Sequence, residues 1–539
     1  MRLHRAPARP ASGNITEMVG WKTRCGLACV AVAFVASGML FIPRLGIETD
    51  EASITSCIYP RAEPRYAWTF GANVLPIMMH SYVGALKSWI FSLLFLVTPP
   101  RPISLRLPTL LIAATTLWLF FALLDRVAGR RAAWIGTLLL ATDPIYLLIN
   151  ATDFGFVTLQ FLFKLAALLL LLRFHRNGSR LALAAAFFLF GLALWDKAVF
   201  SWVLFGLAVA ALVVIPRELW RHFTRANVAV AASALLVGAL PLVAYNVARP
   251  LETLRANAKL EHVEVSIKGL ILKRTVDGSG LFGFMTGVES GPRPGEARHW
   301  YQSLSVSASE GTGHPHQNLI IAALLASMAA LPLLWRTPAR KPILFGAITC
   351  AVTWVAMALT AGAGAAVHHV ILLWPFHLLA IAAALSRVPL APCAAVAALL
   401  CASNVAVTNQ YYADLISNGP AIHWTDAMDP LQAYLDGLHA PKIYAADWGF
   451  METMTLLSEG RLPMYYADLS SGESIGGMIG DPANVFVAFT PPFGFHLNEP
   501  AAIENVAARE KFVREQIATI YDRNGRPTFD VFRFRKLHL

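Results

Sequence analysis

Charged residues are scarce in this sequence. Asp, Glu, Lys and Arg make up 14% of the 539 residues, whereas 56% are hydrophobic and the mean hydropathy is +0.54. These proportions exclude an ordinary soluble domain. The formal net charge of +11 does not indicate a nucleic-acid partner, because the Lys and Arg residues lie mainly in short clusters between apolar runs. That pattern is typical of the cytoplasmic loops of membrane proteins.

Several common functional signatures are also missing. The six cysteines lie at positions 25, 29, 57, 350, 393 and 401, and their spacing forms neither a disulfide framework nor a metal site. No phosphate-binding loop, dinucleotide fingerprint, Ser-His-Asp or Cys-His signature occurs in a suitable context. These absences argue against a nucleotide-driven pump. They also indicate that any transferred group arrives already activated, from the membrane.

Long apolar runs dominate the chain instead, and a helix of about 20 apolar residues crosses the hydrocarbon core. The runs lie near 25–43, 104–124, 132–149, 154–173, 181–195, 198–215, 227–247, 317–335, 342–360, 366–385 and 388–406. The sequence therefore predicts an α-helical polytopic membrane protein with about eleven transmembrane helices in residues 25–406. A basic, cytoplasmic N-terminus (1–24) precedes an uncleaved first span.

A further run, 71–97, is ambiguous because it contains polar residues such as His80 and Lys87. If this run crossed the membrane, the basic cluster at 125–131 would lie outside, against the positive-inside rule. We therefore expect 71–97 to be an interfacial or re-entrant helix. The resulting topology places the loops 44–103 and 250–316 on the extracytoplasmic side.

The tail, 407–539, lies on the same side and is more polar than the rest of the chain. Short runs of alternating or β-branched residues predict strands, and one segment has a helical pattern. The expected strands lie at 442–445, 484–489 and 529–534, and the expected helix at 500–519. The tail is therefore predicted to be a small extracytoplasmic α/β domain.

The candidate catalytic groups begin with three carboxylates just after the first apolar run, namely Glu48, Asp50 and Glu51. Asp50 or Glu51 could act as a base on an acceptor hydroxyl, or the segment could be a solvated acidic turn. Asp153 lies where one apolar run ends and the next begins. It could cap the helix that starts at Phe154, or supply the second carboxylate of an acid–base pair.

The same face receives basic residues at the ends of other runs. Lys197 could hold a phosphate, although an ion pair with Asp196 is the simpler local explanation. His368 and His369 begin a run, but adjacent side chains diverge by about 100° on a helix and are poor joint metal ligands. A histidine that donates to a lipid phosphate is favoured over a zinc site. Charges within apolar sequence are costly unless they are paired or functional.

The order of these features resembles the GT-C type of membrane glycosyltransferases. The similar branch contains protein O-mannosyltransferases and the bacterial transferases that attach aminoarabinose to lipid A. The resemblance covers about the first 200 residues, and more loosely 368–385 and the tail. The matching features are Thr49-Asp50-Glu51-Ala52, the segment 76–97, Ser104-Leu105-Arg106-Leu107-Pro108, Gly129-Arg130-Arg131, Leu140-Ala141-Thr142-Asp143-Pro144 before Asp153, and Gly191-Leu192-Ala193-Leu194 before Lys197.

The resemblance implies that a sugar carried on a polyprenyl phosphate is transferred, with inversion, to an extracytoplasmic acceptor. It implies that Asp50 is the general base with Glu51 as its partner, that Asp153 is the second acid, and that Lys197 approaches the lipid phosphate. Two positions depart from the family pattern, since 73–80 replaces a usual Lys-Pro-Pro and two histidines replace a basic-aromatic pair. The other expected substrate-binding residues are His80, Arg106, His368 and His369.

The favoured function is thus an integral glycosyltransferase of the inner (plasma) membrane, acting on a cell-envelope glycan, a lipid or a protein. No metal site is predicted, and a divalent cation is left open as a cofactor.

The alternative is a transporter or flippase of a lipid-linked glycan, which would place charges near mid-membrane and often repeat its halves. A third is a degenerate family member that keeps the fold as a scaffold. The joint retention of Asp50, Glu51, Asp153 and Lys197 weighs against it.

Overall fold

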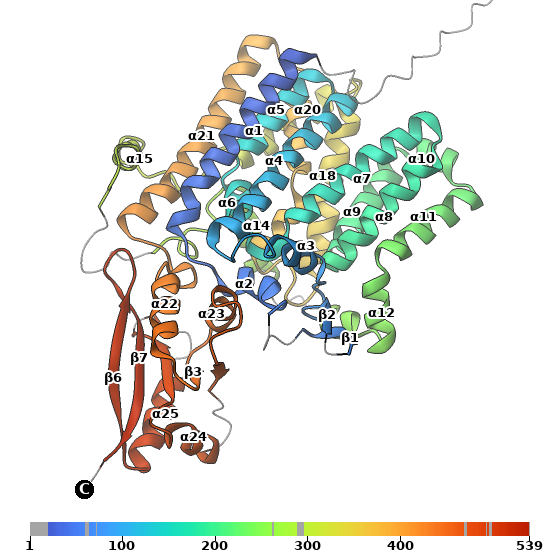
Figure 1. Cartoon of the computed structure of the whole chain (residues 1–539). Coiled ribbons are helices and arrows are strands. Elements are labelled where there is room, and N and C mark those ends of the chain that lie inside the picture. Colours follow the sequence, from blue (N-terminus) through green and yellow to red (C-terminus); the bar gives the residue numbers. More distant parts are fainter. Residues whose placement is uncertain are drawn as a thin grey trace, which may run out of the picture.

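The chain folds into a helical bundle with a smaller domain attached at one end (Figure 1). The computed structural model describes residues 20–59, 64–71, 73–260, 264–287, 296–467, 472–491, 493–494 and 498–537. Most of the basic segment expected at 1–24 lies outside the described residues.

Within the described residues, five helices are long and apolar enough to cross a membrane. They are α1 (Trp21–Phe41) with η1 (Ile42–Arg44), α4 (Pro102–Val127), η2 (Phe154–Phe156) with α7 (Thr158–Asn177), α18 (Arg340–Ala358) and α21 (Leu390–Ser417). Four helix pairs also pass but are bent by 43–105°. They are α5 (Arg130–Thr142) with α6 (Pro144–Thr152), α9 (Phe200–Val214) with α10 (Pro216–His222), α11 (Arg225–Gly238) with α12 (Leu240–Ala248), and α19 (Val367–Val370) and η3 (Ile371–Leu373) with α20 (Phe376–Leu385).

Two shorter helical segments cover the remaining apolar runs, namely α8 (Arg180–Asp196) and the pair α16 (Ile320–Ala329) and α17 (Leu331–Leu334). Every predicted run therefore falls on helical structure, and the polytopic helical fold is confirmed. Counted by length and composition, five helices in the described residues qualify as candidate spans, or nine if each bent pair is one span, and α8 and α16 are too short for this count. The helices α6, α10, α12 and α17 each begin with a proline at their first or second position. Proline ends the preceding helix because it lacks an N–H and clashes with the turn before it.

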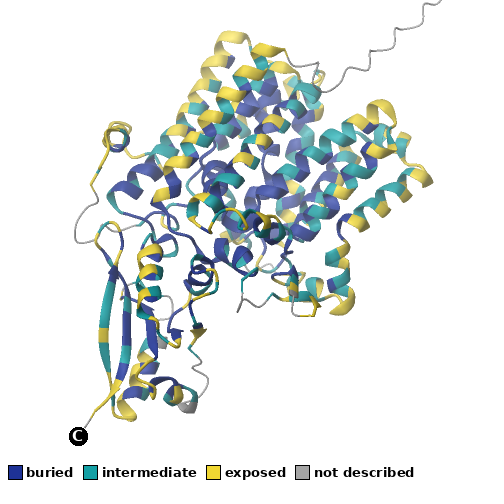
Figure 2. Cartoon of the chain, in the orientation of Figure 1, coloured by how far each residue is buried: buried dark blue, intermediate teal, exposed yellow. Residues whose placement is uncertain are grey.

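The interior of the bundle is buried, and its outward faces are exposed along whole helices (Figure 2). The exposed side chains on α9 and α11 include Val213, Leu236 and Val237, as expected of surfaces that face lipid. Helices α8 and α11 meet through glycines, because a Cβ on Gly191 would lie 2.3 Å from the Leu235 carbonyl oxygen. Small residues of this kind allow close helix packing in membranes.

The segment 71–97 differs from the prediction of one helix. Its first part is a strand, β2 (Asn73–Met78), paired antiparallel with β1 (Tyr66–Phe70), and only α3 (Leu86–Leu94) is helical. With nine residues, α3 is too short to cross the hydrocarbon core. Its outward side chains Ile90 and Leu93 are exposed and apolar, whereas Lys87 points inward and is buried. This amphipathic pattern fits a helix lying at the membrane surface.

The loop 250–316, which was predicted to be extracytoplasmic, has regular structure of its own. It contains three helices, α13 (Glu252–Asn257), α14 (Val265–Val276) and α15 (Trp300–Gly311). Helix α15 is held against α21 by reciprocal hydrogen bonds between Ser305 and Asn409. Residues 261–263 and 288–295 of this loop lie outside the described residues.

The C-terminal domain is an α/β structure, as predicted, and α21, which leads into it, continues to Ser417. Its strands form one sheet in the order β4-β3-β5-β7-β6, with β3 parallel to β4 and β5 and the other pairs antiparallel. The strands are β3 (Ile443–Ala445), β4 (Met464–Tyr466), β5 (Val485–Phe489), β6 (Phe512–Tyr521) and β7 (Pro527–Lys536).

Helices cover both faces of this sheet (Figure 1). They are η4 (Ile422–Trp424), α22 (Met428–Leu438) and α23 (Met451–Leu457) on one face, and α24 (Gly472–Ile479) and α25 (Asn498–Arg509) on the other. The helix expected at 500–519 ends at Arg509, and the chain continues as the edge strand β6. Polar and apolar residues alternate only weakly from Val513 to Ile520, so the sequence pattern predicted a helical period where the chain forms a strand.

Candidate active site

The acidic segment after α1 forms the short helix α2 (Thr49–Ser56), and its three carboxylates have three different environments. Glu48 is the N-cap, and its side chain accepts hydrogen bonds from the backbone N–H groups of Asp50 (2.8 Å) and Glu51 (3.2 Å). These bonds pair N–H groups that a helix start leaves unpaired. The Asp50 side chain takes no part in the cap, and it is half-buried.

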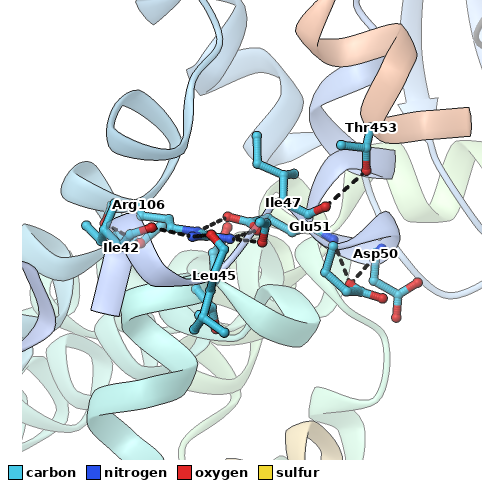
Figure 3. Close-up of polar contacts among 12 residues, drawn as sticks. Ile42, Leu45, Ile47, Asp50, Glu51, Arg106 and Thr453 are labelled. Atoms are coloured by element: carbon cyan, nitrogen blue, oxygen red, sulfur yellow. Dashed lines mark hydrogen bonds and ion pairs between the residues drawn. The ribbon is translucent and has the colours of Figure 1, made fainter. Parts of the chain in front are cut away.

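Glu51 points to the opposite side and forms an ion pair with Arg106 of α4 (Figure 3). The guanidinium donates Nε to Oε1 (2.8 Å) and Nη2 to Oε2 (2.7 Å) of Glu51. Three further N–H groups donate to the carbonyl oxygens of Ile42 (3.1 Å), Leu45 (2.7 Å) and Gly46 (2.6 Å). An arginine has five N–H donors, so Arg106 has used all of them inside the protein.

Asp50 lies within electrostatic range of a different set of groups. Burial raises the pKa of Asp50, and the nearby charges of Lys197 and His80 partly offset that rise. Burial lowers the pKa of His80, which also lies within electrostatic range of Asp50 and Lys197. A carboxylate with a raised pKa beside a cation is a common arrangement for a general base.

Backbone pairing brings the connection between β2 and α3 to the junction of α8 and α9. Val83 pairs with Lys197 as an isolated bridge, and the Ala198 N–H donates to the Tyr82 carbonyl oxygen (2.8 Å). The expected ion pair between Asp196 and Lys197 is absent from the described residues. Asp196 accepts from Gln160 Nε2 (2.6 Å) instead, and Lys197 Nζ donates to the carbonyl oxygen of Gly155 (2.7 Å).

Asp153 ends α6 with a left-handed backbone (φ 50°), and its side chain does not cap the following turn. The capping explanation considered for the sequence is therefore wrong. Its carboxylate forms a buried ion pair with Lys87 of α3 and accepts from the Thr158 hydroxyl (3.4 Å). Burial lowers the pKa of Lys87 to about 8. Lys87 was not among the expected site residues, although a lysine in an otherwise apolar run was a signal for it.

Gly155 joins these groups to the two histidines. It has φ +72°, and a Cβ there would lie 2.2 Å from Cβ of His368, so both its backbone and its packing need glycine. The His368 ring stands edge-on to the Phe154 ring, and its centre lies 4.4 Å from the centre of the His369 ring. Among the described residues, His368 Nδ1 and both ring nitrogens of His369 are buried without a hydrogen-bond partner.

The structure thus brings together residues from five separate segments at the end of the bundle that carries α2, α3 and the C-terminal domain (Figure 1). Phe156 lies between the two lysines, with Lys87 Nζ 5.2 Å and Lys197 Nζ 5.8 Å from its ring centre. The residues that converge are Asp50, His80, Lys87, Asp153, Lys197, His368 and His369. Arg106 and Glu51 form a separate, closed hydrogen-bond network. In the described part of the chain, no group of three or more His, Cys, Asp or Glu side chains is arranged to hold a metal ion.

Comparisons with known proteins concern the family and the fold of the chain. Residues 83–245 match the family model described as dolichyl-phosphate-mannose-protein mannosyltransferase. The crystal structure of ArnT from Cupriavidus metallidurans bound to undecaprenyl phosphate is similar over 94% of this chain and 97% of that chain, with 14% identity and a TM-score of 0.56. The apo oligosaccharyltransferase of Archaeoglobus fulgidus is similar over 92% of this chain and 70% of that chain, with 13% identity and a TM-score of 0.45.

No curated protein sequence matches the chain. The resemblance to GT-C membrane glycosyltransferases that the sequence showed is confirmed by the family match and the ArnT structure. The fold is that of these multi-pass membrane proteins.

Proposed function

We propose that this chain is an integral-membrane glycosyltransferase that moves a sugar from a polyprenyl-phosphate donor to an acceptor on the extracytoplasmic face, with Asp50 as the general base. The observation that carries the proposal is that the half-buried Asp50 carboxylate lies within electrostatic range of Lys197 and His80, at the end of the bundle that also holds the Lys87–Asp153 ion pair. The mannosyltransferase family match and the undecaprenyl phosphate of the similar ArnT structure support a lipid-phosphate donor.

The reaction needs both signs of charge in one place. Asp50 accepts the proton of the acceptor hydroxyl as its oxygen attacks the anomeric carbon, and the bond from that carbon to the phosphate oxygen breaks. The electron pair leaves with the polyprenyl phosphate, whose developing charge is stabilised by cationic neighbours. Lys197, whose charge acts on Asp50, has this role, and the His368 and His369 nitrogens that have no partner among the described residues can donate to the same phosphate.

The Lys87–Asp153 pair and the Glu51–Arg106 pair have supporting roles in this proposal. Lys87 fixes Asp153 beside the acceptor path, because a buried carboxylate is stable only with a partner. Glu51 and Arg106 hold the start of α2 and so fix the direction of Asp50. We therefore assign Arg106 to positioning rather than to the substrate contact that the sequence suggested.

The basic clusters support the extracytoplasmic location of the site. Arg126 lies within electrostatic range of Arg176, and Glu218 is paired with Lys341 (2.6 Å). These residues come from four basic clusters, at 125–131, 173–176, 217–225 and 336–341. Helix α10, which lies in one of these clusters, is at the end of the bundle opposite α2 (Figure 1). By the positive-inside rule that end faces the cytoplasm, and the site then lies on the outer face of the inner (plasma) membrane.

The test is transfer of radiolabelled sugar from polyprenyl-phosphate donors in membranes that contain the wild-type chain, Asp50→Asn or Asp125→Asn at matched levels. Asp125 is paired with Arg130 at the opposite end of the bundle and serves as the control. We expect label in an acceptor fraction with the wild type and Asp125→Asn, and its loss with Asp50→Asn. Equal transfer by Asp50→Asn, or label that crosses the bilayer while still on its lipid, would contradict the proposal.

A further inference from the structure

The acidic segment is held on a second side by the C-terminal domain. The Thr453 hydroxyl of α23 donates to the carbonyl oxygen of Ile47 (3.2 Å; Figure 3), and the Gly46 N–H donates to the carbonyl oxygen of Trp424 (2.8 Å). Arg523 Nη1, at the turn between β6 and β7, donates to the carbonyl oxygen of Pro43 (2.7 Å). Three separate parts of the domain therefore contact residues 43–47.

The fit at Gly46 is close. A Cβ at this position would lie 1.8 Å from the carbonyl oxygen of Thr425, which is a backbone atom that cannot rotate away. The Gly46 carbonyl also accepts from Arg106 Nη2 (2.6 Å). The segment is thus fixed between α4 of the membrane bundle and η4 of the C-terminal domain.

Apolar packing continues the same contact into α2. Leu456 of α23 is fully buried in one cluster with Ile47 and Ala52, together with Phe91 of α3 and Leu105 of α4. Thr453 is fully buried as well. The face of α23 that carries these side chains is therefore complementary to the segment that places Asp50.

We propose that the C-terminal domain is a positioning element of the active site, and that Thr453 and Gly46 are the residues through which it fixes the Asp50 carboxylate. This inference rests on the proposed function. It assigns to the domain a part in the chemical step, in addition to any contact with the acceptor. Displacements of about 1 Å in a reacting group cost roughly 100-fold in rate, so a segment of this kind needs support on more than one side.

The experiment compares Thr453→Val, which keeps the shape and removes the hydroxyl, with Thr453→Ser, which restores it. Thr455→Val on the same helix is the matched control, because Thr455 is buried but makes no hydrogen bond to residues 43–50 among those described. Transfer kinetics, pH dependence and thermal unfolding are measured on full-length protein in detergent with the same donor. Asp50→Asn is included as a reference.

We expect Thr453→Val to lower kcat about tenfold with an unchanged KM for the lipid donor, and Thr453→Ser to recover most of it. Burial raises the pKa of Asp50, so water that enters when residues 43–50 are held less tightly lowers that pKa. In Thr453→Val the acidic side of the pH–rate profile therefore moves to lower pH. Thr455→Val changes neither kcat nor the acidic side of the pH–rate profile. Gly46→Ala, which separates the two surfaces, has a larger effect on kcat than Thr453→Val.

The outcomes separate the two proposals. If Asp50→Asn retains transfer, the proposed function fails. If Asp50→Asn abolishes transfer but Thr453→Val matches Thr455→Val in kcat and in pH profile, the function stands and the positioning role is overturned. A change in thermal unfolding that is equal in both threonine variants, with no change in kcat, overturns it as well.

Discussion

Glu51 and Asp50 are neighbours in the chain, yet they belong to two regions with opposite character. In the Glu51–Arg106 ion pair every polar group has a hydrogen-bond partner. Arg106 donates its five N–H groups to the Glu51 carboxylate and to three carbonyl oxygens. The Asp50 carboxylate is half-buried, and, within the described part of the chain, His368 Nδ1 and both ring nitrogens of His369 are buried without a hydrogen-bond partner. A closed network of charges stabilises a conformation, whereas open polar groups in a dry setting can bind something from outside.

The largest expected effect comes from breaking the closed region. Arg106→Gln leaves Glu51 buried without a cation and removes donors from three carbonyl oxygens, so we expect a loss of about 3–5 kcal/mol of folding stability. Thermal unfolding in detergent measures it. Arg126→Gln on the same helix is the control, because Arg126 is half-buried and makes one hydrogen bond to Ala122. Normal unfolding together with lost donor binding would instead assign Arg106 to substrate.

The open region should respond in the opposite way. Asp50→Asn keeps the helix cap, which uses Glu48, so we expect unfolding within about 0.5 kcal/mol of the wild type. The transfer rate should fall by about 10²–10⁴-fold, the usual contribution of a general base. Rate and unfolding measured on one preparation test the contrast. A large destabilisation by this variant would show that the two regions are not distinct.

Lys197→Met tests the cationic group of the open region. We expect about a 100-fold loss in kcat, because the departing phosphate loses a neighbouring charge. The Gly155 carbonyl oxygen also loses its donor, and that cost should appear as a smaller change in unfolding. Lys341→Met at the opposite end is the control. An unchanged kcat would remove Lys197 from the phosphate site.

A smaller change is expected in the pH dependence of the transfer rate. Burial raises the pKa of Asp50, so transfer should be full above that pKa and fall about tenfold for each pH unit below it. The positive charge of Lys197 lowers the same pKa, so its removal should move the acidic limb to higher pH. The pH dependence of kcat in the wild type and Lys197→Met measures both. A limb that moves to lower pH in the variant would contradict the assignment of Asp50.

Much of the fold could be predicted because lipid imposes a simple rule on sequence. Apolar runs long enough to cross the membrane become helices, and each of the predicted runs did so. The hairpin β1–β2 was missed because a short pair of strands that packs on the bundle, rather than on a sheet of its own, leaves almost no periodic signal. The same limit applies to β6, whose pairing with β7 outweighs a helical pattern.

The site was predictable as a set of segments but not as a set of contacts. Placing Asp50, Asp153, Lys197 and His368 on one face needed only topology and the distribution of Lys and Arg. The contacts of Lys87 and Gln160 could not be predicted, because their partners, Asp153 and Asp196, are distant in the chain.

The sequence by itself determined that this is a membrane bundle with polar residues gathered at one end and a small α/β domain beside them. It did so because hydrophobicity and charge act residue by residue and need no knowledge of neighbours. Only the tertiary structure decided which carboxylate caps a helix, which is neutralised by Arg106, and which stays open toward Lys197. Those roles depend on distances between segments far apart in the chain, and such distances are fixed by packing alone.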